Sequence, residues 1–125
     1  MTKFKFTMAA LTLALSLFSF NGFAGEVDVV KVQFKKSAPQ TYRFDVTLAH
    51  SDSGWDHYAD RWDVVAPNGD ILASRVLAHP HVNEQPFTRS LGGVHIPEHI
   101  TSITIQGHDK VHELGGKVKK IDLTK

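Results

Sequence analysis

The sequence has no cysteine among its 125 residues. This absence excludes disulfide bonds, thiolate zinc sites, iron–sulfur clusters, a cysteine nucleophile and a lipid-modified N-terminal cysteine. An excess of charge of one sign is also missing, since 14 Lys and Arg residues stand against 13 Asp and Glu residues. Nucleic-acid-binding proteins normally carry a clustered basic excess, so we expect no nucleic-acid partner. A chain of this length holds one domain.

Long apolar runs are scarce, and the clearest one, residues 8–20, lies near the N-terminus. It is 13 residues long, whereas a membrane-spanning helix needs about 20. Lys3 and Lys5 precede the run, and the small residues Gly22 and Ala24 follow it as in a cleavage site. We therefore predict a signal peptide over residues 1–24, cleaved after Ala24, and a periplasmic or secreted product that has no membrane span after cleavage.

Alternation of apolar and polar residues predicts β-strands along residues 25–125. Every second residue is apolar in Thr41–Leu48, and residues 30–35 alternate in the same way after a break at Val29–Val30 that is typical of a β-bulge. The same pattern predicts further strands over residues 61–66, 71–77, 87–94, 101–106 and 117–123. Seven short strands without a helical pattern favour one all-β domain, an immunoglobulin/fibronectin-like sandwich of antiparallel strands.

Histidine is abundant, with eight residues that all lie within residues 25–125. If successive strands run in opposite directions, the connections 49–60, 78–86 and 107–116 meet at one end of the sandwich. These three connections hold six histidines: His50, His57, His79, His81, His108 and His112. His95 and His99 are expected on the surface elsewhere. Loops on a rigid scaffold often carry binding sites, so the histidine-rich end is the candidate site.

The histidine spacing favours a transition-metal site, because imidazole is a good ligand for Cu and Zn. His79 and His81 flank a proline that favours extended backbone, and alternate residues of an extended segment point the same way. The predicted ligands are three or four members of one set: His57, His79, His81, His108 and His112. The plainer alternative for each is a solvated loop histidine.

Polar neighbours of these histidines are expected to orient the ligands or to line the rim of the site. Asp109, for example, could accept a hydrogen bond that selects a ligand's tautomer. A salt bridge between Arg89 and an aspartate of the aromatic loop is the ordinary interpretation of that charge. The predicted orienting and rim residues are His50, Asp56, Asp60, Glu84, Arg89 and Asp109.

Aromatic residues at the same end support a second hypothesis, a protein- or glycan-recognition module. Its contact residues would be Trp55, Tyr58 and Phe87, and its partner would be another periplasmic protein or a glycan. An enzymatic function is less favoured. The sequence has no nucleophile elbow, no phosphate-binding glycine-rich loop and no zinc-protease helix motif, so we assign no catalytic residue.

Three segments carry a resemblance to known proteins: residues 54–62, which read GWDHYADRW, residues 79–90, which read HPHVNEQPFTRS, and the tail from His108 to Gly116. In these segments the chain resembles a family of small, uncharacterised secreted or periplasmic bacterial β-sandwich proteins. The similarity extends over most of residues 25–125. The resemblance implies export and a β-sandwich fold, and it implies no activity.

Overall fold

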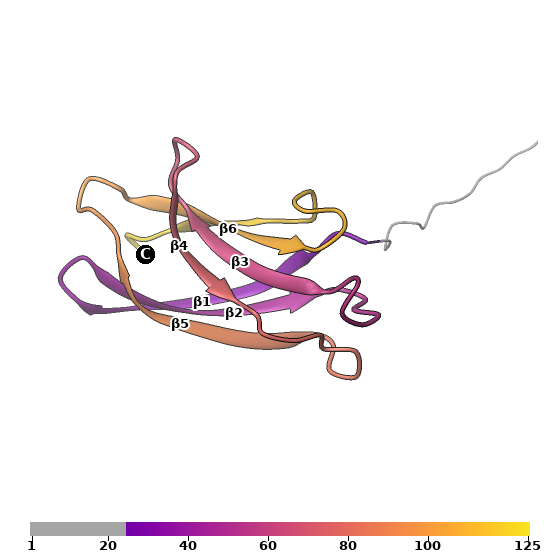
Figure 1. Cartoon of the computed structure of the whole chain (residues 1–125). Helices are drawn as coiled ribbons and strands as arrows, with labels where there is room; N and C mark the ends of the chain where they lie inside the picture. The colour runs from indigo at the N-terminus through magenta and orange to yellow at the C-terminus, as the bar shows by residue number, and fades with distance from the viewer. Residues whose placement is uncertain (1–24) are drawn as a thin grey trace, which may run out of the picture.

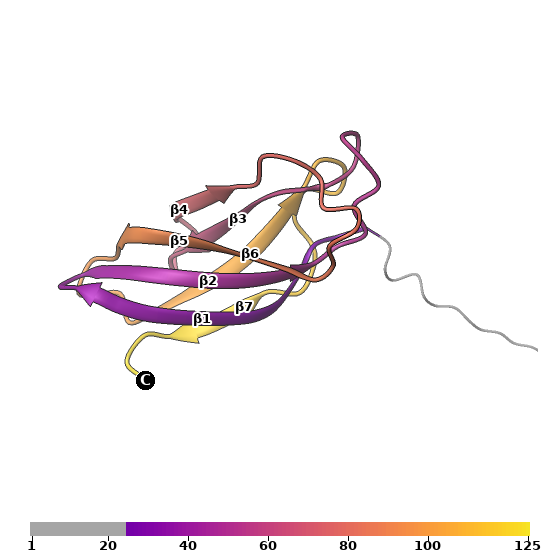
Figure 2. The ribbon, with the colours of Figure 1, turned by 90° about the horizontal axis from the view of Figure 1, so that it is seen from below.

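The computed structural model describes residues 25–125, so the predicted signal peptide, residues 1–24, lies outside the described residues. Seven strands form two facing sheets (Figure 1, Figure 2). In chain order the strands are β1 (Asp28–Ala38), β2 (Thr41–Ala49), β3 (Ala59–Val65), β4 (Ile71–Val76), β5 (Phe87–His95), β6 (Ser102–Asp109) and β7 (Lys119–Asp122). The prediction of an all-β sandwich is confirmed.

The two sheets are antiparallel throughout, and their strand orders are β1-β2-β5 and β4-β3-β6-β7. After β2 the chain crosses to the second sheet for β3 and β4, and it then returns to pair β5 with β2. Such crossings between sheets are characteristic of immunoglobulin-like sandwiches. The register of β1 against β2 shifts between Val29 and Lys31, which confirms the predicted bulge.

The core lies between the sheets and contains the apolar side chains that alternation placed on the inner faces. Trp62 of β3 and Phe44 of β2 are fully buried. Burial of a large apolar side chain contributes about 1.5–3 kcal/mol to folding, so such residues dominate the stability of a domain without disulfides. Their fully buried neighbours on the inner faces are Val46, Leu48, Val64, Phe87, Ile103 and Ile105.

Strand β6 is longer than predicted and ends at Asp109 instead of Gln106. Its pairing with β3 continues through Arg61↔His108 and Ala59↔Asp109. Because side chains alternate across a strand, His108 and Asp109 point to opposite faces of the sheet. Asp109 is fully buried and His108 is half-buried.

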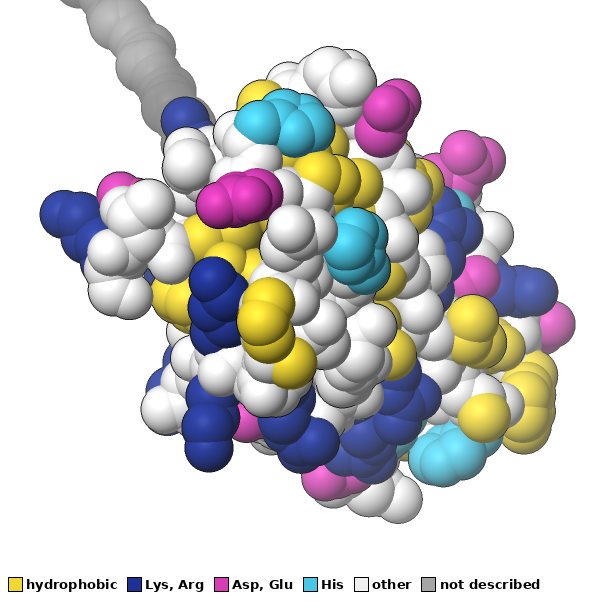
Figure 3. All heavy atoms as spheres, turned by 90° about the vertical axis from the view of Figure 1, so that its left-hand side faces the viewer, with side chains coloured by type: hydrophobic (Ala, Val, Ile, Leu, Met, Phe, Trp, Pro, Cys, Tyr) yellow, Lys and Arg dark blue, Asp and Glu magenta, His cyan; other side chains and the backbone are white. Residues whose placement is uncertain are grey.

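The β2–β3, β4–β5 and β6–β7 connections lie at the same end of the sandwich, the right-hand end in Figure 1. The opposite end faces the viewer in Figure 3, where Lys and Arg side chains are prominent and histidines lie apart from one another. His95 ends β5 at that end, His99 follows in the next loop, and both are exposed. In residues 25–125 no helix has the length and apolar character needed to cross a membrane.

Candidate metal centre

Three side chains from the loop end bring metal-binding atoms together: His50, His57 and Asp109. The Nε2 atom of His50 lies 3.2 Å from Nε2 of His57 and 3.2 Å from Oδ2 of Asp109. The Nε2 atom of His57 lies 3.7 Å from the same Asp109 oxygen. This arrangement could hold a metal ion, since two imidazole nitrogens and a carboxylate oxygen face one point.

The backbone of three different segments positions these groups. His50 directly follows β2, and Asp109 is the last residue of β6. His57 lies in the β2–β3 loop, where its backbone pairs with Gly54, and Gly54 adopts a positive φ of 148° that suits glycine. The tight loop turns the His57 ring toward the other two residues.

Asp109 has one carboxylate oxygen engaged and one free of hydrogen bonds. Oδ1 accepts the backbone N–H groups of Val111 and His112, whereas the buried Oδ2 has no hydrogen-bond partner. Burial alone would raise the pKa of Asp109, but these two N–H groups and the nearby His50 and His112 lower it below its ordinary value. The site therefore contains a buried carboxylate whose free oxygen faces imidazole nitrogens.

The tautomer of His50 follows from its partners. Nδ1 of His50 bonds to the carboxylate of Asp52, which can only accept, so Nδ1 carries a hydrogen. In neutral His50 the Nε2 atom then carries a lone pair instead of a hydrogen. This lone pair faces two oxygen atoms, the carbonyl oxygen of Gly25 at 2.8 Å and Oδ2 of Asp109. The lone pair can accept a hydrogen bond from Nε2–H of His57, 3.2 Å away, but against the two oxygens it needs a cation, either a proton on Nε2 or a metal ion.

The protonation of His50 reflects the same surroundings. Burial lowers the pKa of His50, but the hydrogen bond and charge of Asp52, the Gly25 carbonyl and the Asp109 charge together raise it above 6.5. A proton and a metal ion would thus compete for the same Nε2 lone pair.

Asp52 anchors this arrangement from behind. Its Oδ1 accepts the backbone N–H of Ala59 as well as Nδ1–H of His50, and its Oδ2 accepts the backbone N–H of His81. Burial raises the pKa of Asp52, but the bonds from His50, His81 and Ala59 outweigh it and lower the pKa below the ordinary value. A carboxylate that orients a ligand histidine is a recurrent feature of metal sites.

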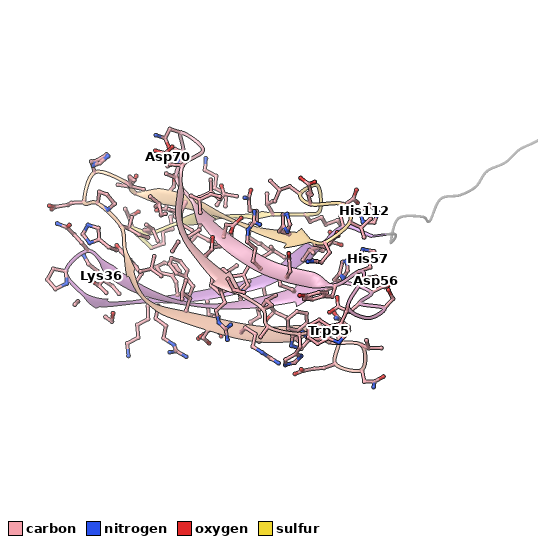
Figure 4. The ribbon with its side chains drawn as sticks, viewed as in Figure 1. Lys36, Trp55, Asp56, His57, Asp70 and His112 are labelled. Carbon is pink, nitrogen blue, oxygen red and sulfur yellow. The ribbon has the colours of Figure 1, made fainter. Side chains whose placement is uncertain are left out.

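His112 lies next to the three central residues, outside the group whose ligand atoms all lie within 4.8 Å of one another. Its Nδ1 is 3.4 Å from Oδ2 of Asp109, and its ring centre is 5.0 Å from that of His57. Figure 4 shows His57 and His112 at the same end of the molecule. Both side chains are partly exposed, which provides a path by which an ion could enter.

The predicted pair His79 and His81 lies apart from the central three. The rings of this pair are close, with centres 4.6 Å apart, but Nε2 of His81 accepts a hydrogen bond from Arg89 at 2.9 Å. The His81 ring stacks on Phe87, and burial, with the charges of Arg89 and His79, lowers the pKa of His81. His81 is therefore a neutral, engaged side chain that supports Asp52 through its backbone N–H.

The charged rim residues have ordinary partners. Arg89 also pairs with Glu84 at 3.1 Å, so the expected salt bridge from Arg89 to an aspartate of the aromatic loop is not formed.

His108 bonds through Nδ1 to Asp60 at 2.6 Å on the outer face of the second sheet. That pairing separates His108 from the central residues, because β6 continues as a strand where a loop was expected. Asp56 is exposed.

Of the three predicted aromatic contacts, one is available at the surface. Trp55 is 65% exposed and rests edge-on against Tyr58. Tyr58 is buried, and Phe87 is a fully buried part of the core. Phe87 therefore cannot contact a partner, because its strand position turns the ring inward.

The most important difference from the sequence prediction concerns His50, which was expected at the rim and lies at the centre. Asp52, which was not among the predicted orienting residues, holds it. The spacing His50-Ser51-Asp52 was the available signal, since a carboxylate two residues from a histidine can reach its ring in a loop.

No family model matches the chain, and no solved structure matches it. The chain is 40% identical over 97 residues to a protein of Halomicrobium mukohataei named "Putative lipoprotein". The match covers 78% of this chain and 47% of that protein, so the chain spans about half the length of this curated relative. The matched protein comes from a halophilic archaeon, whereas the resemblance predicts a bacterial family.

Proposed function

We propose that this protein is an extracytoplasmic module that binds a transition-metal ion, Zn(II) in preference to Cu(II), for storage, delivery or sensing. The observation that carries the proposal is the convergence of two imidazole Nε2 atoms on the unpartnered, buried Oδ2 of Asp109. Buried polar atoms are normally hydrogen-bonded, so an unpartnered carboxylate oxygen among histidines is best explained as a cation ligand.

The spacing of the ligand atoms supports zinc. Bonds of about 2.0–2.1 Å at tetrahedral angles separate ligand atoms by about 3.3–3.4 Å. The three distances among the ligand atoms of His50, His57 and Asp109 are 3.2, 3.7 and 3.2 Å. A square-planar Cu(II) site would instead separate neighbouring atoms by about 2.9 Å and opposite atoms by about 4.1 Å.

Two features support a location outside the cytoplasm. The N-terminal segment has the signal-peptide pattern, and the archaeal relative is named as a lipoprotein. Histidine and carboxylate donors also suit an oxidising compartment, where thiolate ligands would be prone to oxidation.

A titration of Zn(II) into the chelator-treated protein tests the proposal. We expect one ion per chain and, at about 100 times the dissociation constant, a stabilisation of about 2.7 kcal/mol. For a domain of this size that corresponds to a rise in Tm of about 10–20 °C. A parallel Cu(II) titration tests the geometry, since Cu(II) binds most nitrogen and oxygen sites more tightly than Zn(II) whatever their shape. A square-planar copper spectrum would make copper the ion instead.

Two variants locate the site. Asp109→Asn keeps the size of the side chain and one acceptor oxygen for the Val111 and His112 N–H groups, so the apo protein should fold. Asp109→Asn and His57→Ala should each weaken zinc binding by about 100-fold or more, beyond the 10–100-fold typical of residues outside the ligand set. His95→Ala, at the opposite end, should bind like the wild type. The absence of saturable 1:1 binding in the wild type, or wild-type affinity in His57→Ala, would overturn the proposal.

The recognition hypothesis has weaker support, because Trp55 is the one exposed member of its three aromatic residues. Binding of another periplasmic protein through this end stays a prediction.

A further inference from the structure

The backbone of Gly25 lies inside the proposed metal centre. Its carbonyl oxygen is 2.8 Å from Nε2 of His50. A Cβ atom at this position would lie 2.1 Å from Cε1 of His112, so only glycine allows the backbone to approach that ring as closely. Gly25 therefore touches two of the histidines that surround Asp109, although it is not a conventional ligand residue.

The same residue follows the predicted cleavage site after Ala24. We propose that removal of residues 1–24 completes the metal centre, because it converts the Gly25 nitrogen into a primary amine that takes the fourth position beside His50, His57 and Asp109. This inference rests on the proposed zinc-binding function. It makes zinc binding a property of the processed protein, acquired after export.

The chemistry of the step is a peptide hydrolysis by water at a leader-cleaving peptidase. The C–N bond between Ala24 and Gly25 breaks, the hydroxyl of water goes to the Ala24 carbonyl to give a carboxylic acid, and the nitrogen of Gly25 gains the other hydrogen to become a primary amine. The acid then gives its proton to solvent and becomes a carboxylate. Before cleavage the nitrogen lone pair is delocalised into the planar peptide bond and cannot act as a donor. After cleavage it is available to a metal ion.

Covalent geometry brings that amine to the site. Within one residue the nitrogen lies less than about 4 Å from the carbonyl oxygen, and the carbonyl oxygen of Gly25 contacts His50. The described chain also begins at the loop end of the sandwich, beside the connections that carry the histidines (Figure 1).

The test compares three proteins that contain the whole described domain, residues 25–125. The first begins with a free amine at Gly25, the second is the same protein acetylated on that amine, and the third keeps Ala24 in front of Gly25. Zinc affinity is measured by competition with a chromophoric chelator, and folding is checked by melting each apo protein. His57→Ala in the free-amine protein is the control for loss of the site.

We expect the acetylated and Ala24-extended proteins to melt as the free-amine protein does without metal, and to bind Zn(II) at least about 10-fold more weakly. Equal zinc affinity in all three, with a loss in His57→Ala, would overturn this inference and leave the proposed function standing. Absence of zinc binding in all three would overturn the proposed function itself. A different N-terminal residue in exported protein, measured by mass spectrometry, would also refute the inference.

Discussion

The carboxylate of Asp52 is hydrogen-bonded to Nδ1 of His50, and both side chains are fully inaccessible to solvent. This pair turns Nε2 of His50 toward Asp109 and His57 and selects the tautomer that leaves Nε2 free for an ion. It also connects the β2–β3 loop to the β4–β5 loop, since Asp52 accepts the backbone N–H of His81. The geometry of the metal centre thus depends on a residue that would not itself bind the metal.

Asp52→Asn should therefore weaken both folding and zinc binding. The amide nitrogen of asparagine cannot accept, so at least one of the donors from His50, Ala59 and His81 loses its partner. We expect a loss of about 1–3 kcal/mol in the free energy of unfolding and a fall of about 10–100-fold in zinc affinity. Denaturant melts and zinc competition measure the two effects. Asp56→Asn, an exposed aspartate of the same loop, is the matched control and should change neither.

His79→Ala and His81→Ala should behave differently although the residues are neighbours. His79 is exposed and its ring bonds to the carbonyl oxygen of Pro80, so its loss should change the stability by less than about 0.5 kcal/mol. His81→Ala removes a buried ring that stacks on Phe87 and one of the acceptors of Arg89, which should cost about 1–3 kcal/mol. Neither ring should be a zinc ligand, and a zinc affinity that falls about 100-fold in His79→Ala would contradict the assigned ligand set.

Alternation predicted the strands well, because most buried positions carry large apolar side chains, as in Tyr42–Leu48. Counting strands then placed the histidine-rich connections at one end. The ligand set was beyond this reasoning because the apolar pattern of β6 stops at Ile105 although the strand continues. The next inward residue is Gly107, where a Cβ would lie 2.4 Å from the Val27 side chain. Because this inward position holds glycine and not an apolar side chain, the alternation that predicts a strand is interrupted there. The continuation turns Asp109 inward and His108 outward.

Gly116→Ala should loosen the connection that carries His112. A Cβ at Gly116 would lie 1.8 Å from the carbonyl oxygen of Val27, and backbone cannot yield as a flexible side chain does. We expect a loss of about 1–3 kcal/mol in the free energy of unfolding and weaker zinc binding. Gly92→Ala is the matched control, because nothing lies within 4 Å of its added Cβ, and it should melt like the wild type. Equal melting of the two variants would show that this close approach is not needed.

Above the ordinary histidine pKa, a rise in pH should lower the Tm of the apo protein and increase the gain in Tm that zinc produces. The raised pKa of His50 means that its stabilising contribution is fully present below 6.5 and is lost as the pH rises through the raised folded value. The lowered pKa values of Asp52 and Asp109 mean that their contributions are present above 3.8 and are lost as the pH falls through the lower folded values. The lowered pKa of His81 acts the other way, because its contribution is lost as the pH falls below 6.5. The apo protein should thus be most stable near pH 6.5.

Zinc reverses the trend at the upper end, because the ion needs the Nε2 lone pair that a proton occupies when His50 is charged. As the pH rises from 6 to 8, we expect the Tm of the apo protein to fall and the rise in Tm on adding zinc to grow. Thermal melts with zinc or with chelator at both pH values measure the effect, and His95→Ala should show the wild-type profile. An apo Tm that is constant over this range would contradict the His50–Asp52 ion pair, and a larger zinc-induced shift at pH 6 would contradict the competition between proton and metal at Nε2.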